Sequence, residues 1–159
     1  MTRSPLSPDS STGARYLAPG AVTARVVKPV VAWLTRRGLG LWGSRVLAVR
    51  GRTSGEVRTT PANVLELDGE RYLVSPRGRT QWVRNLRAAG EGELLLGRHR
   101  EAFTAVELAD AEKPAVLRPY LRRWAFEVGA FFEGVGAGAS DAELLAAAPR
   151  HPVFRLSPR

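Results

Sequence analysis

The sequence predicts an α+β fold in which helices flank a small β-barrel. Five or six short segments between residues 45 and 156 have the apolar, β-branched pattern of strands and are separated by turn residues. Helical patterns lie between and around those strands, which is typical of a barrel within an α+β domain. With 159 residues and no internal repeat, we expect a flexible tail at 1–20 and a single domain at 21–159.

The first regular element is expected to be a basic, amphipathic helix within residues 22–37. Its apolar residues recur at helical spacing, and its arginine and lysine side chains lie opposite them. Pro29 lacks a backbone donor, so the regular part is expected to begin near it. Such a helix either packs on the core or, through Trp33 and its cations, rests on an anionic membrane surface. The pattern leaves both interpretations open.

Three strands are expected next. Residues 45–50 form the first strand and end in a turn-rich loop at 51–55. Residues 58–67 form the second strand, which is rich in β-branched and apolar residues. The Asp-Gly pair at 68–69 is the preferred two-residue hairpin turn, because both positions accept positive φ. The third strand therefore follows at 71–75.

A short helix and a second hairpin come after these strands. Thr80 is a suitable N-cap for a helix at 81–89. Two further strand patterns, at 93–97 and 101–108, are expected to pair as a hairpin around the Arg-His-Arg segment at 98–100.

The C-terminal third is expected to be largely helical. Asp110 is a suitable cap for a helix that ends near residue 128, and Pro119 is expected to kink it. A further helix is expected at 142–148, with Ser140 or Asp141 as its cap. The last element is a short strand at 151–156.

The composition excludes several classes of protein. There is no cysteine, which rules out disulfides, thiolate catalysis and cysteine-ligated metal sites. The net charge is +9, and residues 1–60, with ten Lys or Arg against two acidic residues, carry +8 of it. A field of this sign attracts polyanions such as nucleic acid, anionic lipid or a phosphorylated cofactor. No secretory signal or membrane span is recognisable, so we expect a cytoplasmic protein, membrane-associated if the basic helix binds lipid.

Two motifs resemble known sites but stand in the wrong context. Residues 38–43 match the dinucleotide fingerprint G-x-G-x-x-G, yet they follow a helix and precede a strand, the reverse of the required order. Residues 51–55 are close to a nucleophile elbow but lack its central serine. His99 and His151 are the two histidines, with no clustered carboxylates, so neither a metal site nor a Ser–His hydrolase is expected.

Two arginine-rich loops form a candidate anion site. The first, residues 52–58, combines two arginines with hydroxyl side chains and free backbone N–H groups. The second, residues 77–80, combines two arginines with a glycine and a threonine just before a helix start. Guanidinium groups and helix N-terminal N–H groups both suit phosphate and carboxylate. One hairpin separates the loops, and a hairpin returns the chain close to its origin, so we expect the loops to be neighbours.

The same stretch resembles a known family. Residues 51–61 read Gly-Arg-Thr-Ser-Gly-Glu-Val-Arg-Thr-Thr-Pro, Ser75 precedes a glycine-containing loop, and residues 81–86 read Gln-Trp-Val-Arg-Asn-Leu. In combination these elements resemble the deazaflavin (F420)-dependent nitroreductase family, split β-barrel oxidoreductases of actinobacterial type. The resemblance runs from residue 46 to 108 and implies a flavin-reductase-like, PNP-oxidase-like split β-barrel with flanking helices.

The resemblance also implies a site for coenzyme F420. An oxidoreductase of this kind transfers hydride from reduced F420 to an electron-poor acceptor, such as a quinone, an activated enone or a nitroaromatic. The implied cofactor-binding residues are Arg52, Thr53, Ser54, Arg58, Thr59, Thr60, Pro61, Ser75, Pro76, Arg77, Gln81, Trp82, Arg84 and Asn85. Ser75 is also expected to assist protonation or to orient the substrate. Phe126, Phe131 and Phe132 are expected either to line the substrate side of the pocket or to belong to the core.

Three other interpretations stay open at this stage. FMN in place of F420 would fit two arginine loops equally well, and a protein that binds F420 without turnover has the same sequence features. A basic small barrel that binds nucleic acid is the alternative outside this class. Its strands would need stacking aromatics, and the predicted strands carry only Tyr72, Phe103 and Phe154, so no nucleic acid is expected. Split barrels of this kind often pair, so a homodimer is also expected.

Overall fold

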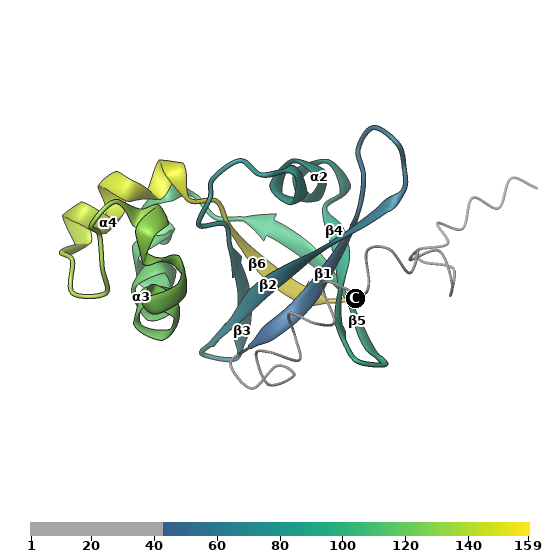
Figure 1. Cartoon of the computed structure of the whole chain (residues 1–159), viewed down its shortest axis with the longest axis horizontal. Coiled ribbons are helices and arrows are strands. Elements are labelled where there is room, and N and C mark those ends of the chain that lie inside the picture. The colour runs from purple at the N-terminus through teal and green to yellow at the C-terminus, as the bar shows by residue number, and fades with distance from the viewer. Residues whose placement is uncertain (1–42) are drawn as a thin grey trace, which may run out of the picture.

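The computed structural model describes residues 43–159. The predicted tail at 1–20, the basic helix at 22–37 and most of the glycine motif at 38–43 lie outside the described residues. Figure 1 shows a β-barrel with α2 (Gln81–Ala89) against one side, and with α3 (Pro114–Val128) and α4 (Asp141–Ala147) together on another. In this described part, no helix has the length and apolar character needed to cross a bilayer.

Six antiparallel strands close the barrel. They are β1 (Ser44–Arg50), β2 (Val57–Leu67), β3 (Glu70–Val74), β4 (Glu91–Leu96), β5 (His99–Glu107) and β6 (Val153–Pro158). Their order around the barrel is β1-β2-β3-β6-β5-β4, and the pairing of β1 with β4 completes the circle. The predicted α+β barrel is confirmed, and every strand begins and ends within two residues of its expected bounds.

The long strand β2 changes partner midway. Residues 57–63 pair with β1, whereas Val64–Leu67 pair with β3. Within residues 43–159, the other edge of the first half of β2 therefore has no strand partner. The N–H of Val64 donates to Gly43 on the β1 side. Because successive N–H groups alternate in direction, the nitrogen of Pro61 faces the open edge, where a missing donor costs no ladder hydrogen bond.

The turn between β2 and β3 sets their register. Asp68 has φ 51° and Gly69 has φ 79°, so both central residues are left-handed, as the predicted hairpin turn requires. The register that results pairs Leu67 with Glu70. A shift of one residue would exchange the two faces of β2, so this turn decides which side chains point into the barrel.

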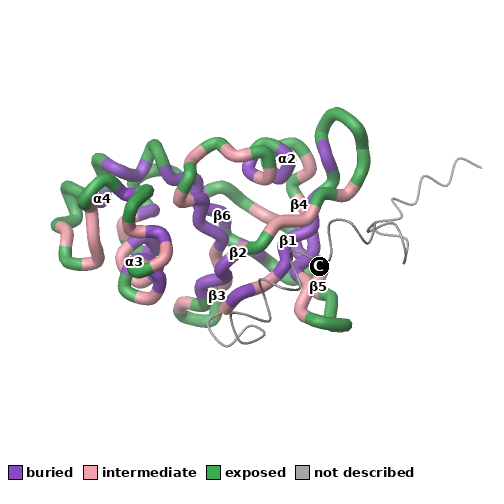
Figure 2. The backbone as a smooth tube through the Cα atoms, viewed as in Figure 1, coloured by how far each residue is buried: buried purple, intermediate pink, exposed green. Residues whose placement is uncertain are grey.

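Two hydrophobic clusters hold the fold together, and Figure 2 shows buried residues along the barrel strands and on one side of α3. The barrel interior contains Leu47, Val49, Val64, Leu73, Val83, Leu86, Leu94, Phe103, Phe154 and Leu156. The second cluster lies between the barrel and α3 and is built around Leu117, Leu121, Trp124 and Phe132. Leu65 and Val74 of the barrel belong to this second cluster, so α3 is anchored next to the point where β2 leaves β1.

The helices follow the prediction except at their N-termini. Helix α2 has its predicted bounds, but the side chain of Thr80 makes no capping hydrogen bond. Ser140 caps α4 as predicted, accepting from the N–H of Glu143. The prediction for Asp110 is wrong, because its carboxylate lies 2.7 Å from the buried ammonium of Lys113 and does not cap a helix. Helix α3 begins after Lys113 and continues through Pro119.

Substitution of Gly92 is expected to strain the barrel. A Cβ at this position would lie 2.8 Å from the carbonyl oxygen of Ala48 and 2.8 Å from the ring of Phe103. We expect Gly92→Ala to lower the free energy of unfolding by about 1–3 kcal/mol, the usual cost of overpacking. Urea denaturation followed by circular dichroism measures this. Gly136→Ala is the control, since nothing lies within 4 Å of its Cβ and its φ is not positive; equal midpoints for the two variants would contradict the prediction.

Candidate functional site

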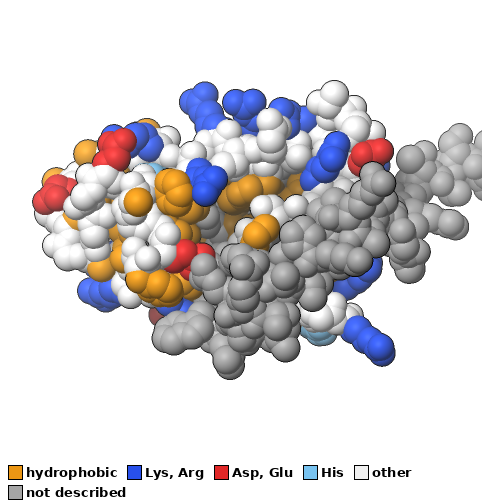
Figure 3. Space-filling view, viewed as in Figure 1, with side chains coloured by type: hydrophobic (Ala, Val, Ile, Leu, Met, Phe, Trp, Pro, Cys, Tyr) orange, Lys and Arg blue, Asp and Glu red, His pale blue; other side chains and the backbone are white. Residues whose placement is uncertain are grey.

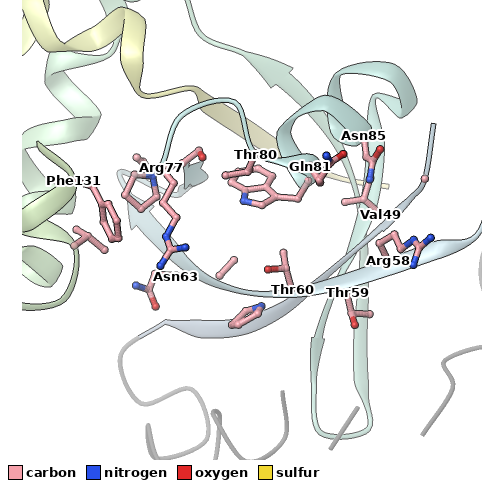
Figure 4. Close-up of a pocket in the computed structure, with 18 of the residues that line it drawn as sticks. Val49, Arg58, Thr59, Thr60, Asn63, Arg77, Thr80, Gln81, Asn85 and Phe131 are labelled. Atoms are coloured by element: carbon pink, nitrogen blue, oxygen red, sulfur yellow. The ribbon is translucent and has the colours of Figure 1, made fainter. Parts of the chain in front are cut away.

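A cleft of about 1000 Å³ opens along the unpaired edge of β2. Its other walls are the loop at 75–80, helix α2, and the end of α3 with the 3-10 helix η2 (Gly129–Phe132) (Figure 4). All of the predicted cofactor residues except Arg84 line it, namely Arg52, Thr53, Ser54, Arg58, Thr59, Thr60, Pro61, Ser75, Pro76, Arg77, Gln81, Trp82 and Asn85. Arg84 lies on the exposed face of α2.

The loop between β1 and β2 is held in place by α2. A hydrogen bond of 2.7 Å from the N–H of Gly51 to Glu56 closes the loop. The side-chain oxygen of Asn85, which is buried, accepts from the backbone N–H of Arg52 at 3.2 Å and from its guanidinium at 2.8 Å. Gln81 accepts from the same guanidinium at 3.0 Å. Asn85 and Gln81 thus orient the first cation of the predicted anion site.

Arginines lie at both ends of the cleft, with Arg52 and Arg58 at the end next to α2. In Figure 4, Arg58 and Asn85 lie at one end, whereas Arg77 and Phe131 lie at the other. The side chain of Arg58 is 64% exposed and 3.7 Å from Glu56, a separation at which an exposed ion pair contributes little. Figure 3 shows Lys and Arg side chains gathered along the α2 side and hydrophobic side chains within the hollow below them. The guanidinium groups of Arg52 and Arg58 therefore remain available to an anionic ligand.

The second loop is organised by Ser75. The Ser75 hydroxyl donates to the carbonyl oxygen of Gly78 at 2.7 Å, and the residue has no exposed surface. Gly78 has φ +82°, which favours glycine, and its N–H donates back to the Ser75 carbonyl. The N–H of Ser75 donates to Pro152 at 2.9 Å. These bonds favour a structural role for the Ser75 hydroxyl over the protonating role expected from the sequence.

Two threonine hydroxyls have no partner among the described residues. They are Oγ1 of Thr59, on β2, and Oγ1 of Thr80, at the start of α2, and both are buried. Figure 4 shows the Thr59 side chain on the face of β2 turned away from Gln81, whereas Thr80 lies on the opposite wall and lines the cleft. A buried hydroxyl without a hydrogen bond costs free energy, so Thr80 favours a ligand with a polar group at this wall. This explains why Thr80 does not cap α2: its side chain faces the cleft.

The three predicted phenylalanines lie in different surroundings. Phe131 lines the cleft, and the guanidinium of Arg77 lies 4.8 Å from its ring centroid. Phe132 is buried in the core cluster beside α3, as the alternative interpretation allowed. Phe126 is 78% exposed and does not line the cleft. Of the three, the structure brings only Phe131 to the site.

Sequence reasoning missed the residues that α3 contributes. Tyr120, Glu127 and Val128 line the cleft together with Asn63 at the end of the open edge. No local motif marks them, and only the helical spacing of Tyr120 and Glu127 could have placed both on one face. Burial and the nearby charge of Glu127 raise the pKa of Tyr120, whereas the side chain of Asn63 lowers it. Over residues 43–159 there is no cluster of His, Asp or Glu that could hold a metal ion.

His151 supports the second loop from behind. Its ring is buried and stacks on Phe132, with 3.9 Å between the ring centroids. Burial lowers the pKa of His151, and the charges of Arg150 and Lys113 act in the same direction. Contacts with the backbone of Ser75 and Pro76 oppose them. The neutral imidazole is therefore the form that packs beneath the cleft.

A sequence model of the F420H(2)-dependent quinone reductase family matches residues 27–128. The match covers well over half of the chain and includes β1 to β5, α2 and α3. No curated protein is similar enough in sequence to be matched.

Several solved structures share the fold. A protein of unknown function from Agrobacterium tumefaciens is 18% identical with a TM-score of 0.56 over 89% of this chain, but the match spans only 57% of that protein. An F420-H2 dependent reductase is 20% identical with a TM-score of 0.50, over 72% of this chain and 94% of that one. A protein of the pyridoxinephosphate oxidase family from Clostridium acetobutylicum is 14% identical with a TM-score of 0.50, over 82% and 84%. The predicted split-barrel fold is confirmed.

The stability of the protein is expected to fall below neutral pH because of His151. Its pKa in the folded state is lower than the ordinary 6.5, so its contribution is fully present above pH 6.5 and is lost as the pH falls toward the folded value. We expect His151→Gln to flatten the dependence of the free energy of unfolding on pH between about 7.5 and 5.5. Urea denaturation at each pH measures this. His99→Gln, at the exposed histidine, is the control, and an identical slope in wild type and His151→Gln would refute the assignment.

Proposed function

The chain belongs to the F420H(2)-dependent quinone reductase family, and on that premise we propose that it reduces a quinone with F420 bound in the cleft along β2. The protein is an F420-dependent oxidoreductase, as the resemblance implied. The narrower nitroreductase assignment is not carried over, because the family is one of quinone reductases. The family is one of F420H(2)-dependent reductases. This favours F420 over FMN as the cofactor, and it favours an enzyme over a protein that binds F420 without turnover.

The residues of the cleft fit the chemistry of this cofactor. F420 carries a phosphate and a chain of glutamates, and Arg52 and Arg58 would hold these anionic groups, assisted by Thr53 and Ser54. The guanidinium of Arg52 is preorganised by Asn85, so little side-chain freedom is lost on binding. The unpartnered hydroxyl of Thr80 would bond to a polar group in the middle of the molecule. Reduced F420 supplies a hydride, two electrons with one proton, to the acceptor.

The open edge of β2 suits a flat ring system. Backbone groups of Thr59 and Pro61 face the cleft there, and the half-buried indole of Trp82 lies on the opposite wall. A ring between these walls would be shielded from water on both faces, which protects a hydride donor from side reactions. The role of the chain is then to bind the two reactants, orient them and exclude water.

The acceptor would occupy the other end of the cleft. Phe131, Val128 and Tyr120 give this end an apolar and aromatic lining. A planar quinone matches such a lining, and the same geometry admits an enone or a nitroaromatic. The observation that carries the proposal is one cleft along the open strand edge, with Arg52 and Arg58 at one end and an aromatic lining, with Arg77 over the ring of Phe131, at the other (Figure 4). The homodimer and the membrane contact expected from the sequence stay predictions.

Loss of Arg52 is expected to weaken F420 binding. We expect Arg52→Ala to raise the Kd roughly tenfold at low salt, since a hydrogen bond to a charged group contributes about 1.5 kcal/mol or more. The difference between wild type and variant should shrink at higher salt, because the contact is ionic. Fluorescence titration of the cofactor measures both. Arg98→Ala, at the exposed turn between β4 and β5, is the control with the same change of charge; equal losses would indicate that only net charge matters.

The acceptor is tested with a panel of compounds. We expect reduced F420 and this protein to reduce menadione with a higher kcat/KM than a nitroaromatic or an activated enone of similar size. Absorbance of oxidised F420 as it forms measures the rate. If the enone or the nitroaromatic is preferred, the proposed acceptor class is wrong although the cofactor assignment stands.

A further inference from the structure

Three polar residues at the aromatic end of the cleft have no role in the function proposed so far. Tyr120 and Glu127 lie two turns apart on α3, and Asn63 is the last residue of the open half of β2. All three line the cleft. In Figure 4, Asn63 lies at the end marked by Arg77 and Phe131, away from Arg58. These groups therefore face the space assigned to the acceptor and not the space assigned to the anionic tail.

The side chain of Asn63 is fixed by two neighbours. Its amide oxygen accepts from the hydroxyl of Ser44 at 3.4 Å, and its amide nitrogen donates to Glu127 Oε2 at 3.4 Å. Ser44 and Asn63 are buried. Neither of these hydrogen bonds involves the Tyr120 hydroxyl, although Tyr120 lines the same cleft as Asn63 and Glu127. Asn63 lowers the pKa of Tyr120 and the charge of Glu127 raises it, as expected for polar groups beside the phenol.

The side chain of Asn63 bonds to Ser44 and Glu127, so the phenol hydrogen of Tyr120 is left for a partner in the cleft. Burial and the charge of Glu127 raise the pKa of Tyr120, so the group stays protonated at neutral pH. The ring is held by Trp124 and Phe132, at centroid distances of 5.0 and 6.4 Å. A rigid, protonated phenol with a fixed oxygen is suited to donate a hydrogen bond and is a poor source of a transferable proton.

Quinone reduction needs such a donor. A quinone that takes up a hydride carries a negative charge on one oxygen, and one proton then completes the hydroquinone. Overall the quinone gains one hydride and one proton, the two hydrogens by which reduced F420 differs from its oxidised form, so the reaction balances without another reagent. A hydrogen-bond donor placed at the oxygen stabilises the charge as it develops. The proton itself comes from water at the open mouth of the cleft.

We propose that the Tyr120 hydroxyl donates a hydrogen bond to the oxygen of the bound quinone on which negative charge develops, and that Asn63 and Glu127 position it. Tyr120 is then a catalytic residue, because it touches the reacting carbonyl group, whereas Asn63 and Glu127 act through it. The inference rests on the proposed function, since it concerns the acceptor of that same site.

The test compares two hydride acceptors. Menadione develops charge on oxygen, whereas the N-methylacridinium cation takes the hydride on carbon and becomes neutral. In single turnovers with reduced F420, we expect Tyr120→Phe to slow menadione reduction on the order of 10²-fold, the usual effect of one oxyanion donor. The rate with N-methylacridinium should stay unchanged, because no oxyanion forms. Asn63→Ala should give a smaller loss with the same preference.

A matched control and a second readout separate this role from folding. Tyr72→Phe removes the hydroxyl of a half-buried tyrosine that packs against the same core cluster outside the cleft, and both of its rates should match wild type. Infrared spectra of carbonyl-labelled menadione, bound with oxidised F420, report the hydrogen bond without turnover. We expect the carbonyl stretch to lie at lower frequency in wild type than in Tyr120→Phe.

The outcomes distinguish the inference from the proposed function. Equal losses with both acceptors, or an unchanged menadione rate with an unchanged carbonyl stretch, overturn the inference and leave quinone reduction in place. A wild-type protein that reduces N-methylacridinium but not menadione overturns the proposed acceptor class, and the role of Tyr120 falls with it.

Discussion

The site depends on the change of partner in β2 between Asn63 and Val64. Had β3 continued alongside the first half of β2, its backbone would occupy the space where the cleft lies, and Thr59 would face another strand. An open edge is normally a risk, because it invites pairing with another chain. Pro61 has no N–H on that side, and α3 and the loop at 75–80 wall the space without pairing with the strand. Within residues 43–159, the edge is thus left open to a ligand, and Pro61 disfavours a further strand there.

The mobile parts of a binding site are loops, and here each loop is tied to a rigid element. Asn85 of α2 holds the loop that carries Arg52, and Ser75 ties the second loop to its own turn and to the segment before β6. The anion-binding groups therefore gain their position from a helix, and the cleft floor gains its position from a strand. Such support lowers the entropy lost when a charged, flexible cofactor binds.

Local features were predicted well and long-range ones were not. The Asp68–Gly69 hairpin depends on two residues that accept positive φ, so four residues of sequence suffice to identify it. Asp110 has the composition of a helix cap, yet it pairs with Lys113, whose ammonium also donates to Ala148 far along the chain. Propensity describes the average behaviour of a residue, and here the ammonium of Lys113, buried through its bond to distant Ala148, takes up the Asp110 carboxylate instead.

By itself, the sequence determined the strand order along the chain, the hairpins, the two arginine loops and a resemblance specific enough to indicate F420. Tertiary structure alone decided which residues share the cleft. Phe131 and Phe132 are adjacent in sequence, and successive side chains of a helical turn point in directions far apart, so one faces the cleft and the other the core. The hydrogen bond from Asn63 to Glu127 likewise depends on how α3 packs against β2, and no spacing along the chain encodes that contact.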